Sequence, residues 1–533
     1  MNFEINTGYN RAFQWIEADN IYFIGYLNTQ KGLIPDSISL KEIFNGCKTE
    51  HDYKTIISQL NGIFSIIICN QEWLMIASDS TRFFPIFYTV NDKKIYVSDD
   101  IEFIREKSQT NGIDKTGKLE FLAGAYTASH RTLFEKVFQV RPMEILVGKN
   151  NKITTGYYGR FSQLKSETTT LLHEDLLIQI KNTINAVFNR LIENLKDKKI
   201  ALPLSSGYDS RLIACKLKEF GCKDVLCFTY GQKTKEVEIS KRVANVLGFP
   251  WYFVEYTSDL IRDFHRTSMF QKYYHYAARG TSMFYLQEYP ALKYLFEKQI
   301  INSDYYALPG HSGDLLRGAL LVKTYPENVK REHLPKLILD QKFIHAYITK
   351  SEKRLLKEQI TDHVNELDSD NSLIPYSVLE DWEMKERTSK YIFNSAHVFT
   401  FFGIKTFFPL WDKDLFECFR ILPSFERKYG KLYKEVIVKE FFIPNNVWFH
   451  DELNPTRFST KIDFFKKKLR PCLPKFIKEK LLIKNDWAFY GPMTKYLLND
   501  LQRHDINPVS NGSSYLYRIL NWYLMKITSN EHF

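Results

Sequence analysis

A short polar loop near the middle of the chain carries the residues best suited to chemistry. It reads Pro203-Leu204-Ser205-Ser206-Gly207-Tyr208-Asp209-Ser210 and lies between an apolar run and a helix-like segment. Small side chains let the backbone approach a phosphate closely, and the start of a helix supplies free N–H groups and a positive dipole. Asp209 suits such a site if Mg²⁺ lies between its carboxylate and the phosphate. The loop lacks the GxxxxGK[ST] pattern of Walker A, and a turn capped by Ser and Asp is the alternative interpretation.

The segments around this loop predict a parallel α/β sheet. Two apolar runs alternate with two helix-like segments, in the order Lys199–Leu204, Leu212–Phe220, Val225–Tyr230 and Glu236–Leu247. This alternation is typical of parallel strands joined by helices. Ligands of such sheets bind at the carboxyl ends of the strands, which is where the polar loop falls. The pattern after about residue 260 is mostly helical.

The first part of the chain, to about residue 160, has a different, β-rich pattern. Short apolar runs are separated by turn residues, at Ile21–Leu27, Gly62–Cys69, Trp73–Ala77, Ile86–Val90 and Lys94–Val97. Regularly spaced short strands predict a sandwich. Helical periodicity then appears over residues 114–126 and 172–196.

The polar loop resembles the S-G-G-x-D-S signature of the asparagine-synthetase family, within the N-type ATP-pyrophosphatases. Ser206 departs from that signature, because it adds a Cβ where the family has Gly. Further segments resemble the family in the same order along the chain. They are Glu236 with Arg242–Gly248, Pro309–Asp314 as a variant of S-G-E-G-x-D, Pro409–Asp412, Leu422-Pro423 and Gly430–Lys434.

The resemblance implies ATP and Mg²⁺ as cofactors. Asp209 and Asp314 would bind the metal, and Lys434 would act in catalysis by neutralising charge that grows in the transition state. Without its flanking pattern, Lys434 would be interpreted as a solvated surface lysine. The implied ATP- and pyrophosphate-binding residues are Leu204, Ser205, Ser206, Gly207, Tyr208, Asp209, Ser210, Phe228 and Gly310.

His311 stands where the family has Glu, a residue proposed to help deprotonate the attacking nitrogen. A His with its ordinary pKa of about 6.5 is suited to that role in catalysis. Contact with the substrate, or simple packing, is the alternative. Leu315 also replaces the second acidic residue of the family loop. Both changes imply an acceptor other than aspartate.

The front of the chain resembles the class II glutamine amidotransferases, through Leu60–Phe64, Ala77–Tyr88, Thr132–Phe134 and Arg141-Pro142. This implies an N-terminal αββα sandwich of NTN-hydrolase type. The family's nucleophile is a Cys at position 2. Here position 2 is Asn and the first Cys is Cys47, while Ser80 and Arg82 replace Arg and Gly. We therefore expect no glutaminase activity, with nitrogen coming from ammonia, an amine substrate or a partner glutaminase.

The expected organisation is a two-domain α/β protein with an extension. A degenerate amidotransferase-like domain over residues 1–165 precedes a parallel-sheet ATP-pyrophosphatase domain with a helical C-terminal part over 166–455. A helical basic extension covers 456–533, and its stretch Lys461–Lys484 mixes basic and apolar residues. A solvated helix face is one interpretation of that stretch, and peripheral contact with an anionic membrane is the other. The sequence leaves a homodimer open.

Composition sets further limits. The net charge of +11 is modest for 533 residues, so we expect no nucleic-acid partner. The seven cysteines are scattered without CxxC pairs, which is typical of a reduced, cytoplasmic protein. No stretch of about 18–20 uninterrupted apolar residues occurs in the sequence, so we expect no membrane span.

The expected function is an ATP-dependent synthetase that adenylates a carboxylate and transfers nitrogen to it. The Gly310–Asp314 variant resembles asparagine-synthetase-like proteins of bacterial surface polysaccharides, which implies a uronic acid as acceptor. One alternative is an amide, lactam or peptide-bond ligase like the lactam and lasso-peptide cyclases of the family. Another is a non-catalytic scaffold.

Overall fold

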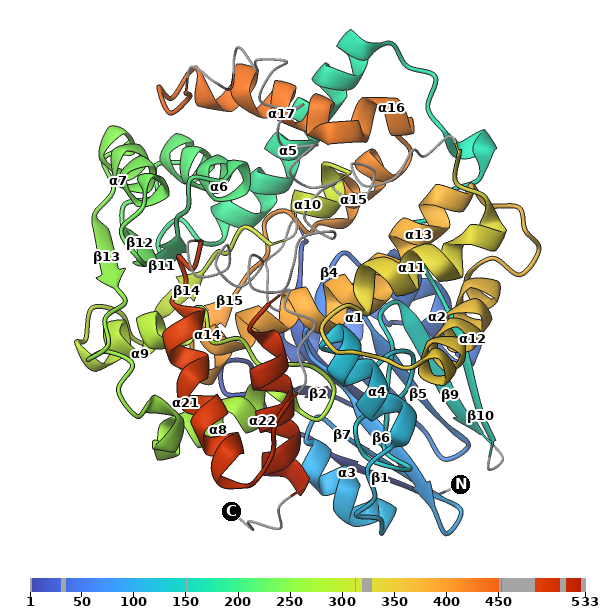
Figure 1. Ribbon diagram of the computed structural model, residues 1–533. Coiled ribbons are helices and arrows are strands. Elements are labelled where there is room, and N and C mark those ends of the chain that lie inside the picture. The colour runs from blue at the N-terminus through green and yellow to red at the C-terminus, as the bar shows by residue number, and fades with distance from the viewer. Residues whose placement is uncertain are drawn as a thin grey trace.

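The computed structural model describes residues 2–29, 35–149, 152–311, 313–318, 328–449, 452, 485–508 and 514–528. Two α/β units pack against each other, and a pair of helices near the C-terminus covers one side of the second unit (Figure 1). The mixed α/β class predicted from the sequence is confirmed. The basic stretch Lys461–Lys484 lies outside the described residues.

The front unit is a sandwich of two sheets. One sheet has six strands in the order β10-β9-β5-β4-β3-β2, and the other has four in the order β1-β7-β6-β8. The larger sheet comprises β2 (Ile16–Ala18), β3 (Ile21–Leu27), β4 (Gly62–Cys69), β5 (Trp73–Ser78), β9 (Glu144–Lys149) and β10 (Lys152–Tyr157). The smaller one comprises β1 (Asn2–Asn6), β6 (Phe87–Asn91), β7 (Lys94–Ser98) and β8 (Phe138–Gln139).

Three apolar clusters explain why helices cover both faces of this sandwich. Strand residues that alternate along β4, β5, β6 and β7 form the cluster between the sheets. A second cluster lies under α1 (Ser37–Ile43) and α2 (Glu50–Gln59), and a third lies under α3 (Ile101–Ser108). The predicted αββα layering is confirmed.

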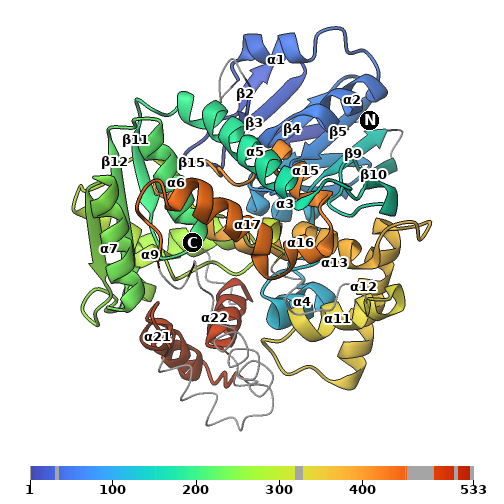
Figure 2. The same ribbon diagram turned by 90° about the horizontal axis from the view of Figure 1, so that it is seen from above.

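The second unit is built on a five-stranded parallel sheet, in the order β13-β12-β11-β14-β15. Its strands are β11 (Lys199–Pro203), β12 (Val225–Gly231), β13 (Trp251–Glu255), β14 (Tyr305–Ala307) and β15 (Lys405–Thr406). Figure 2 shows that α5 (His173–Glu193), α6 (Tyr208–Glu219) and α17 (Lys431–Ile437) lie alongside one another. The parallel arrangement agrees with the sequence prediction, but β14 and β15 lie in a region where we expected mainly helices.

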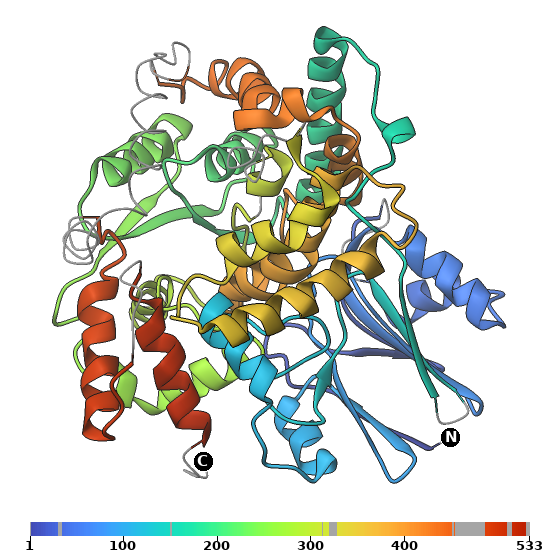
Figure 3. The same ribbon diagram turned by 45° about the vertical axis from the view of Figure 1, so that its right-hand side comes forward.

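Helices make up most of the described chain after β13. They include α8 (Ser268–Ala278), α9 (Tyr289–Glu297), α11 (Leu334–Lys342), α12 (Lys350–Leu367), α13 (Pro375–Glu383) and α15 (Lys413–Arg420). Residues Met384–Ile392 continue α13 as a π-helix. The C-terminal pair, α21 (Tyr490–Arg503) and α22 (Leu516–Thr528), stands beside α8 (Figure 3), where Trp522 packs edge-on against Tyr274 at 5.0 Å between ring centroids. Within the described ranges, no helix has both the length and the hydropathy to cross a membrane.

Asp412 joins the two units. Its Oδ2 atom accepts hydrogen bonds from Asn28 Nδ2 at 2.9 Å and Asn61 Nδ2 at 3.1 Å, both from the front unit. Its Oδ1 atom pairs with Arg190 Nη2 at 2.8 Å. The neighbouring Trp411 donates from Nε1 to Ser80 Oγ at 2.6 Å. The joint therefore combines two sequence motifs that lie more than 300 residues apart.

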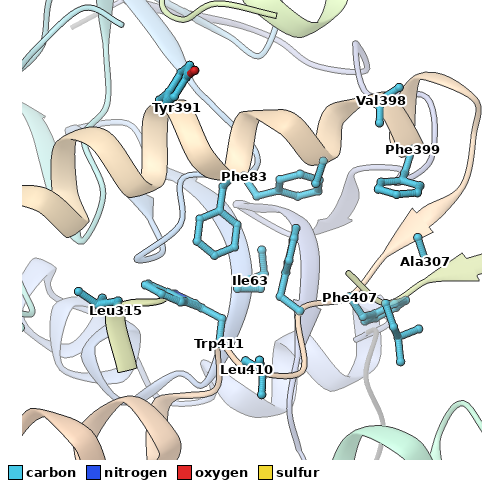
Figure 4. Packing of buried hydrophobic residues seen from close by; sticks show 14 of the residues in the cluster. Ile63, Phe83, Ala307, Leu315, Tyr391, Val398, Phe399, Phe407, Leu410 and Trp411 are labelled. Carbon is cyan, nitrogen blue, oxygen red and sulfur yellow. The ribbon is translucent and has the colours of Figure 1, made fainter. Parts of the chain in front are cut away.

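Apolar packing surrounds these polar contacts. Figure 4 shows Ile63 and Phe83 of the front unit among Phe407, Leu410 and Trp411 of the second unit. All five side chains are nearly inaccessible to solvent. The two units consequently share one continuous core.

We expect Asp412→Ala to destabilise the whole chain by roughly 3 kcal/mol, because it leaves the half-buried amides of Asn28 and Asn61 without their acceptor and removes the buried partner of Arg190. Thermal unfolding followed by calorimetry measures the loss as a lower Tm. Asp414→Ala is the matched control, since Asp414 also pairs with Arg190 but its side chain is 57% exposed. Equal Tm values for the two variants would contradict a structural role for Asp412.

Candidate active site

The polar loop follows β11 at the carboxyl edge of the parallel sheet. Leu204 N–H donates to Phe228 O of β12 at 2.9 Å, which holds the start of the loop against the neighbouring strand. Within the loop, Ser205 Oγ accepts from Gly207 N–H at 3.2 Å and lies 3.0 Å from Ser210 Oγ. Helix α6 then begins at Tyr208. The loop is thus a preformed turn that presents a helix N-terminus.

A second loop, after β14, packs against the first. Gly313 lies so close to Asp209 that a Cβ at position 313 would be 2.2 Å from Asp209 Oδ1. A Cβ at Gly310 would be 3.1 Å from the Asp209 Cβ. Gly310 therefore permits the close approach of the two loops, and Gly313 leaves room for the Asp209 carboxylate. The structure brings together two segments that the sequence separates by about a hundred residues.

Asp209 is the electrostatic centre of this contact. Burial raises the pKa of its carboxyl to about 6, although Tyr433 donates a hydrogen bond to Oδ1 at 2.6 Å and Arg317 lies nearby. The charge of Asp314 raises the pKa further. A desolvated carboxylate beside a second carboxylate is an arrangement that a bound cation stabilises.

These residues fit a magnesium ion. Mg²⁺ in phosphate sites takes one or two carboxylates from the protein and completes its shell with phosphates and water. Asp209 and Asp314 supply that number, and Asp314 is 68% exposed and paired with Arg317. The described part of the chain contains no cluster of three or more His, Cys, Asp or Glu side chains for a metal held by protein alone.

Lys434 lies beside the same loop. It is half-buried on α17, and its Nζ atom lies 5.9 Å from the centroid of the Tyr208 ring. Burial lowers the pKa of its amine, and Arg317 lowers it further. A Cβ at position 430 would lie 3.3 Å from Arg317 Cβ and 3.4 Å from Lys434 Cε, so Gly430 leaves room for both side chains. Lys434 is therefore placed at the loop rather than on an open surface.

A cavity of about 830 Å³ opens from the two loops. At one end it is lined by Ser205, Gly207, Asp209, Ser210, Gly310, Gly313 and Asp314. Leu204, Ser206, Tyr208, Phe228 and Lys434 are not among its lining residues. The side chains of Leu204 and Phe228 are buried in the core, so only the backbone of Phe228 supports the loop.

His311 lines the cavity next to the loop. Its Nε2 atom lies 2.7 Å from Ser395 Oγ. The centroid of its ring lies 5.8 Å from the ring centroids of Phe393 and Phe408. Burial lowers the pKa of the imidazole to about 4, so the ring is neutral and only weakly basic near pH 7. The ordinary pKa assumed from the sequence does not hold at this position. The surroundings suit a hydrogen-bonding contact residue better than a general base.

Glu288 is a cavity residue that the sequence analysis missed. Burial raises the pKa of its carboxyl to about 7, partly offset by the hydrogen bond that Tyr230 donates to Oε1 at 2.7 Å. The sequence gives no signal for it, because Glu288 only precedes a helix with Pro290 in its first turn. Arg317, three positions after Asp314, was also missed, and Tyr433 was included in the Gly430–Lys434 segment without a role of its own.

We expect Glu288→Gln to change the pH dependence of stability. Because the pKa of folded Glu288 is raised, the native state binds more protons than the unfolded chain, and this contribution to stability is lost as the pH rises through about 7. The neutral Gln lacks that loss, so Tm of the variant relative to wild type should rise from pH 5 to pH 8. Glu297→Gln, on the exposed side of α9, is the control. A pH-independent difference would contradict the buried carboxyl.

Comparisons with known proteins agree with this architecture. Residues 47–159 match the glutamine amidotransferase domain family. The microcin J25-processing protein McjC of Escherichia coli is 29% identical over 181 residues. That match covers 33% of this chain and 32% of McjC, so the chain spans about a third of its relative.

Two solved structures show looser likeness. A glutamine phosphoribosylpyrophosphate amidotransferase from B. subtilis is 11% identical over 45% of this chain and 72% of its own, with a TM-score of 0.19. An NH3-dependent NAD synthetase from Campylobacter jejuni is 14% identical over 37% of this chain and 96% of its own, also with a TM-score of 0.19. The amidotransferase match lies in the front unit, and the ordered motifs of the second unit resemble those of the asparagine-synthetase-like family.

Proposed function

We propose that the protein is an ATP-dependent carbon–nitrogen ligase that forms an amide through an acyl-adenylate. A carboxylate oxygen of the acceptor attacks the α-phosphorus of ATP, and the bond to pyrophosphate breaks. A nitrogen nucleophile then attacks the acyl carbon, loses a proton and displaces AMP. The observation that carries this proposal is the contact between the loops that bear Asp209 and Asp314, at the carboxyl edge of a parallel sheet.

Each element of the site has a role in this proposal. The backbone and hydroxyl groups of Ser205–Ser210 bind pyrophosphate, and the start of α6 supplies positive dipole. Asp209 and Asp314 hold Mg²⁺, which neutralises phosphate charge. Lys434 stabilises negative charge as it develops on the reacting phosphoryl group. His311 and Ser395 contact the acceptor on the cavity wall.

In this proposal the front unit is structural and does not hydrolyse glutamine. No Cys occurs among residues 1–46. Nitrogen then comes from ammonia, from an amine on a substrate or from a partner glutaminase.

Two acceptor classes are supported by different observations. The His311 variant of the second loop favours a sugar carboxylate such as a uronic acid. The name of the relative McjC describes processing of a microcin, which favours a lactam or peptide-bond ligase. Cytoplasmic location, peripheral membrane contact through the basic stretch and a homodimer stay predictions.

Magnesium-dependent exchange of labelled pyrophosphate into ATP tests the proposal. The assay uses the full chain with a panel of uronic acids, amino acids and short acidic peptides, and ATP binding is measured by calorimetry on the same samples. We expect ATP binding that needs Mg²⁺, and exchange with one acceptor class. If the protein neither binds ATP nor catalyses exchange, the proposal fails and a non-catalytic scaffold is the remaining interpretation. Turnover of an amine-bearing substrate in the absence of ammonia would favour the lactam or peptide-bond ligase.

A further inference from the structure

The cavity extends away from the two loops to a charged end that the function proposed above does not use. Lys342 of α11, Glu383 of α13 and Arg387 of the adjoining π-helix all line this end. Glu383 lies between the two cations, with Lys342 Nζ 2.7 Å from Oε2 and Arg387 Nη1 3.0 Å from Oε1. These three described side chains carry two positive charges and one negative charge.

Arg387 is the open member of the cluster. Its side chain is 34% exposed, whereas the side chains of Lys342 and Glu383 are 4% and 5% exposed. The guanidinium is held on one side by Glu383 and lies 5.6 Å from the centroid of the Tyr391 ring. Such a prearranged guanidinium suits planar anions, because it has five N–H donors in a fixed fork.

The charge of this end contrasts with that of the remaining cavity wall. Among the described lining residues, Lys342 and Arg387 are the only Lys or Arg side chains. Apart from Glu383, the other charged lining residues are Asp209, Asp314 and Glu288, which are acidic. His311 and His345 are uncharged near neutral pH, since burial lowers the pKa of each to about 4. An anionic group that enters the cavity is therefore attracted to the Arg387 end once the phosphate site is filled.

One helical stretch connects this end to the reaction site. Arg387 and Thr388 lie in the π-helix, Ile392 ends it, and Ser395 follows in a 3₁₀ turn, and all four line the cavity. Ser395 Oγ contacts His311 beside the phosphate loops. Ser395 lies eight positions after Arg387 along this helical stretch. π-Helical segments occur frequently at functional sites.

We propose that Arg387, supported by Lys342 and Glu383, binds a second anionic group of the acceptor, remote from the carboxylate that is activated. The acceptor class is thus an extended molecule with two acidic groups, such as an acidic peptide or an acidic glycan fragment. Thr388 and Gln341, which also line this end, offer hydrogen bonds to the same group. The inference rests on the proposed function, because it assumes that the loop end of the cavity is occupied by nucleotide.

Calorimetry with model diacids tests this inference on the full chain. The protein is saturated with Mg²⁺ and a non-hydrolysable ATP analogue, and the probes are linear α,ω-dicarboxylates from succinate to sebacate and their monomethyl esters. We expect the longer diacids to bind roughly ten- to a hundredfold more tightly than their monoesters, because the esters lack one charged acceptor. Arg387→Gln should remove this difference, and Arg387→Lys should restore part of it.

A variant expected to tighten diacid binding, rather than weaken it, separates a role in binding from a purely structural role. Glu383→Gln removes the carboxylate between the two cations, so diacids should bind more tightly than to wild type. A loss of packing alone would weaken binding in every variant. Arg354→Gln is the matched control, because Arg354 is 83% exposed on α12 and does not line the cavity. Circular dichroism and Tm confirm that each variant is folded.

Three outcomes would overturn the inference. They are equal affinity for diacids and monoesters, absence of binding by both, and an unchanged preference in Arg387→Gln. If the nucleotide analogue binds normally in any of these cases, the proposed function stands and only the acceptor inference fails. If the wild-type protein binds no nucleotide, the proposed function fails and the inference fails with it.

Discussion

Asp209→Asn is expected to reduce magnesium-dependent ATP–pyrophosphate exchange by more than about a hundredfold, because the neutral amide cannot hold the cation against the phosphates. Asn has nearly the same shape as Asp, so the close contact with Gly313 is retained. Burial raises the pKa of the Asp209 carboxyl to about 6, which means that the charged form is costly in the free protein. The variant should therefore be at least as stable as wild type at pH 8.

The loss of activity and the gain of stability are measured separately. Exchange assays with a magnesium titration give the first, and Tm at pH 8 gives the second. Asp259→Asn is the control, because Asp259 is 83% exposed and pairs with Arg262. Wild-type exchange in Asp209→Asn would show that this carboxylate does not hold the metal.

Lys434→Met should lower kcat by roughly a hundred- to a thousandfold, as expected when a charge that stabilises the transition state is removed. Met keeps the length and apolar stem of the side chain, which is half-buried near Tyr208. Because Lys434 does not line the cavity wall, we expect the KM for the acceptor to change little. Steady-state kinetics with the acceptor found in the exchange assay separates kcat from KM.

The matched control for Lys434 lies on the same helix. Lys431 begins α17, one turn before Lys434, and its side chain is 56% exposed. Lys431→Met should leave kcat within about twofold of wild type, as is usual for an exposed surface position. Similar losses in both variants would mean that α17 as a whole, rather than the Lys434 amine, is what matters.

The sequence predicted the strand, turn and helix around the polar loop because these depend on local patterns. The run Lys199–Leu204 and the small residues after it predict a strand, a turn and a helix without knowledge of any distant contact. The order of the later motifs then predicted which carboxylates would meet, and Gly313 does lie against Asp209. Whether these residues bind ATP and Mg²⁺ stays a prediction.

Other parts of the site depend on contacts that a linear pattern does not contain. Strands β14 and β15 have only three and two residues, too few for alternation to be visible. Glu288 has an unusual pKa because the fold buries it beside Tyr230, and nothing in its neighbouring residues predicts that burial. The cluster around Arg387 likewise requires α11 and α13 to meet at Glu383.

The joint at Asp412 bears on how a chain of this kind can change over time. Trp411 and Asp412 of the second unit find their hydrogen-bond partners in the front unit, at Ser80, Asn28 and Asn61. The front unit therefore covers part of the core of the second unit. A gene that stopped encoding the front unit would expose that core to solvent and destabilise the second unit. Loss of a catalytic nucleophile from the front unit, by contrast, would leave the contacts of Trp411 and Asp412 unchanged. A front unit without catalytic activity would then still be retained, because its side chains complete the core of the second unit.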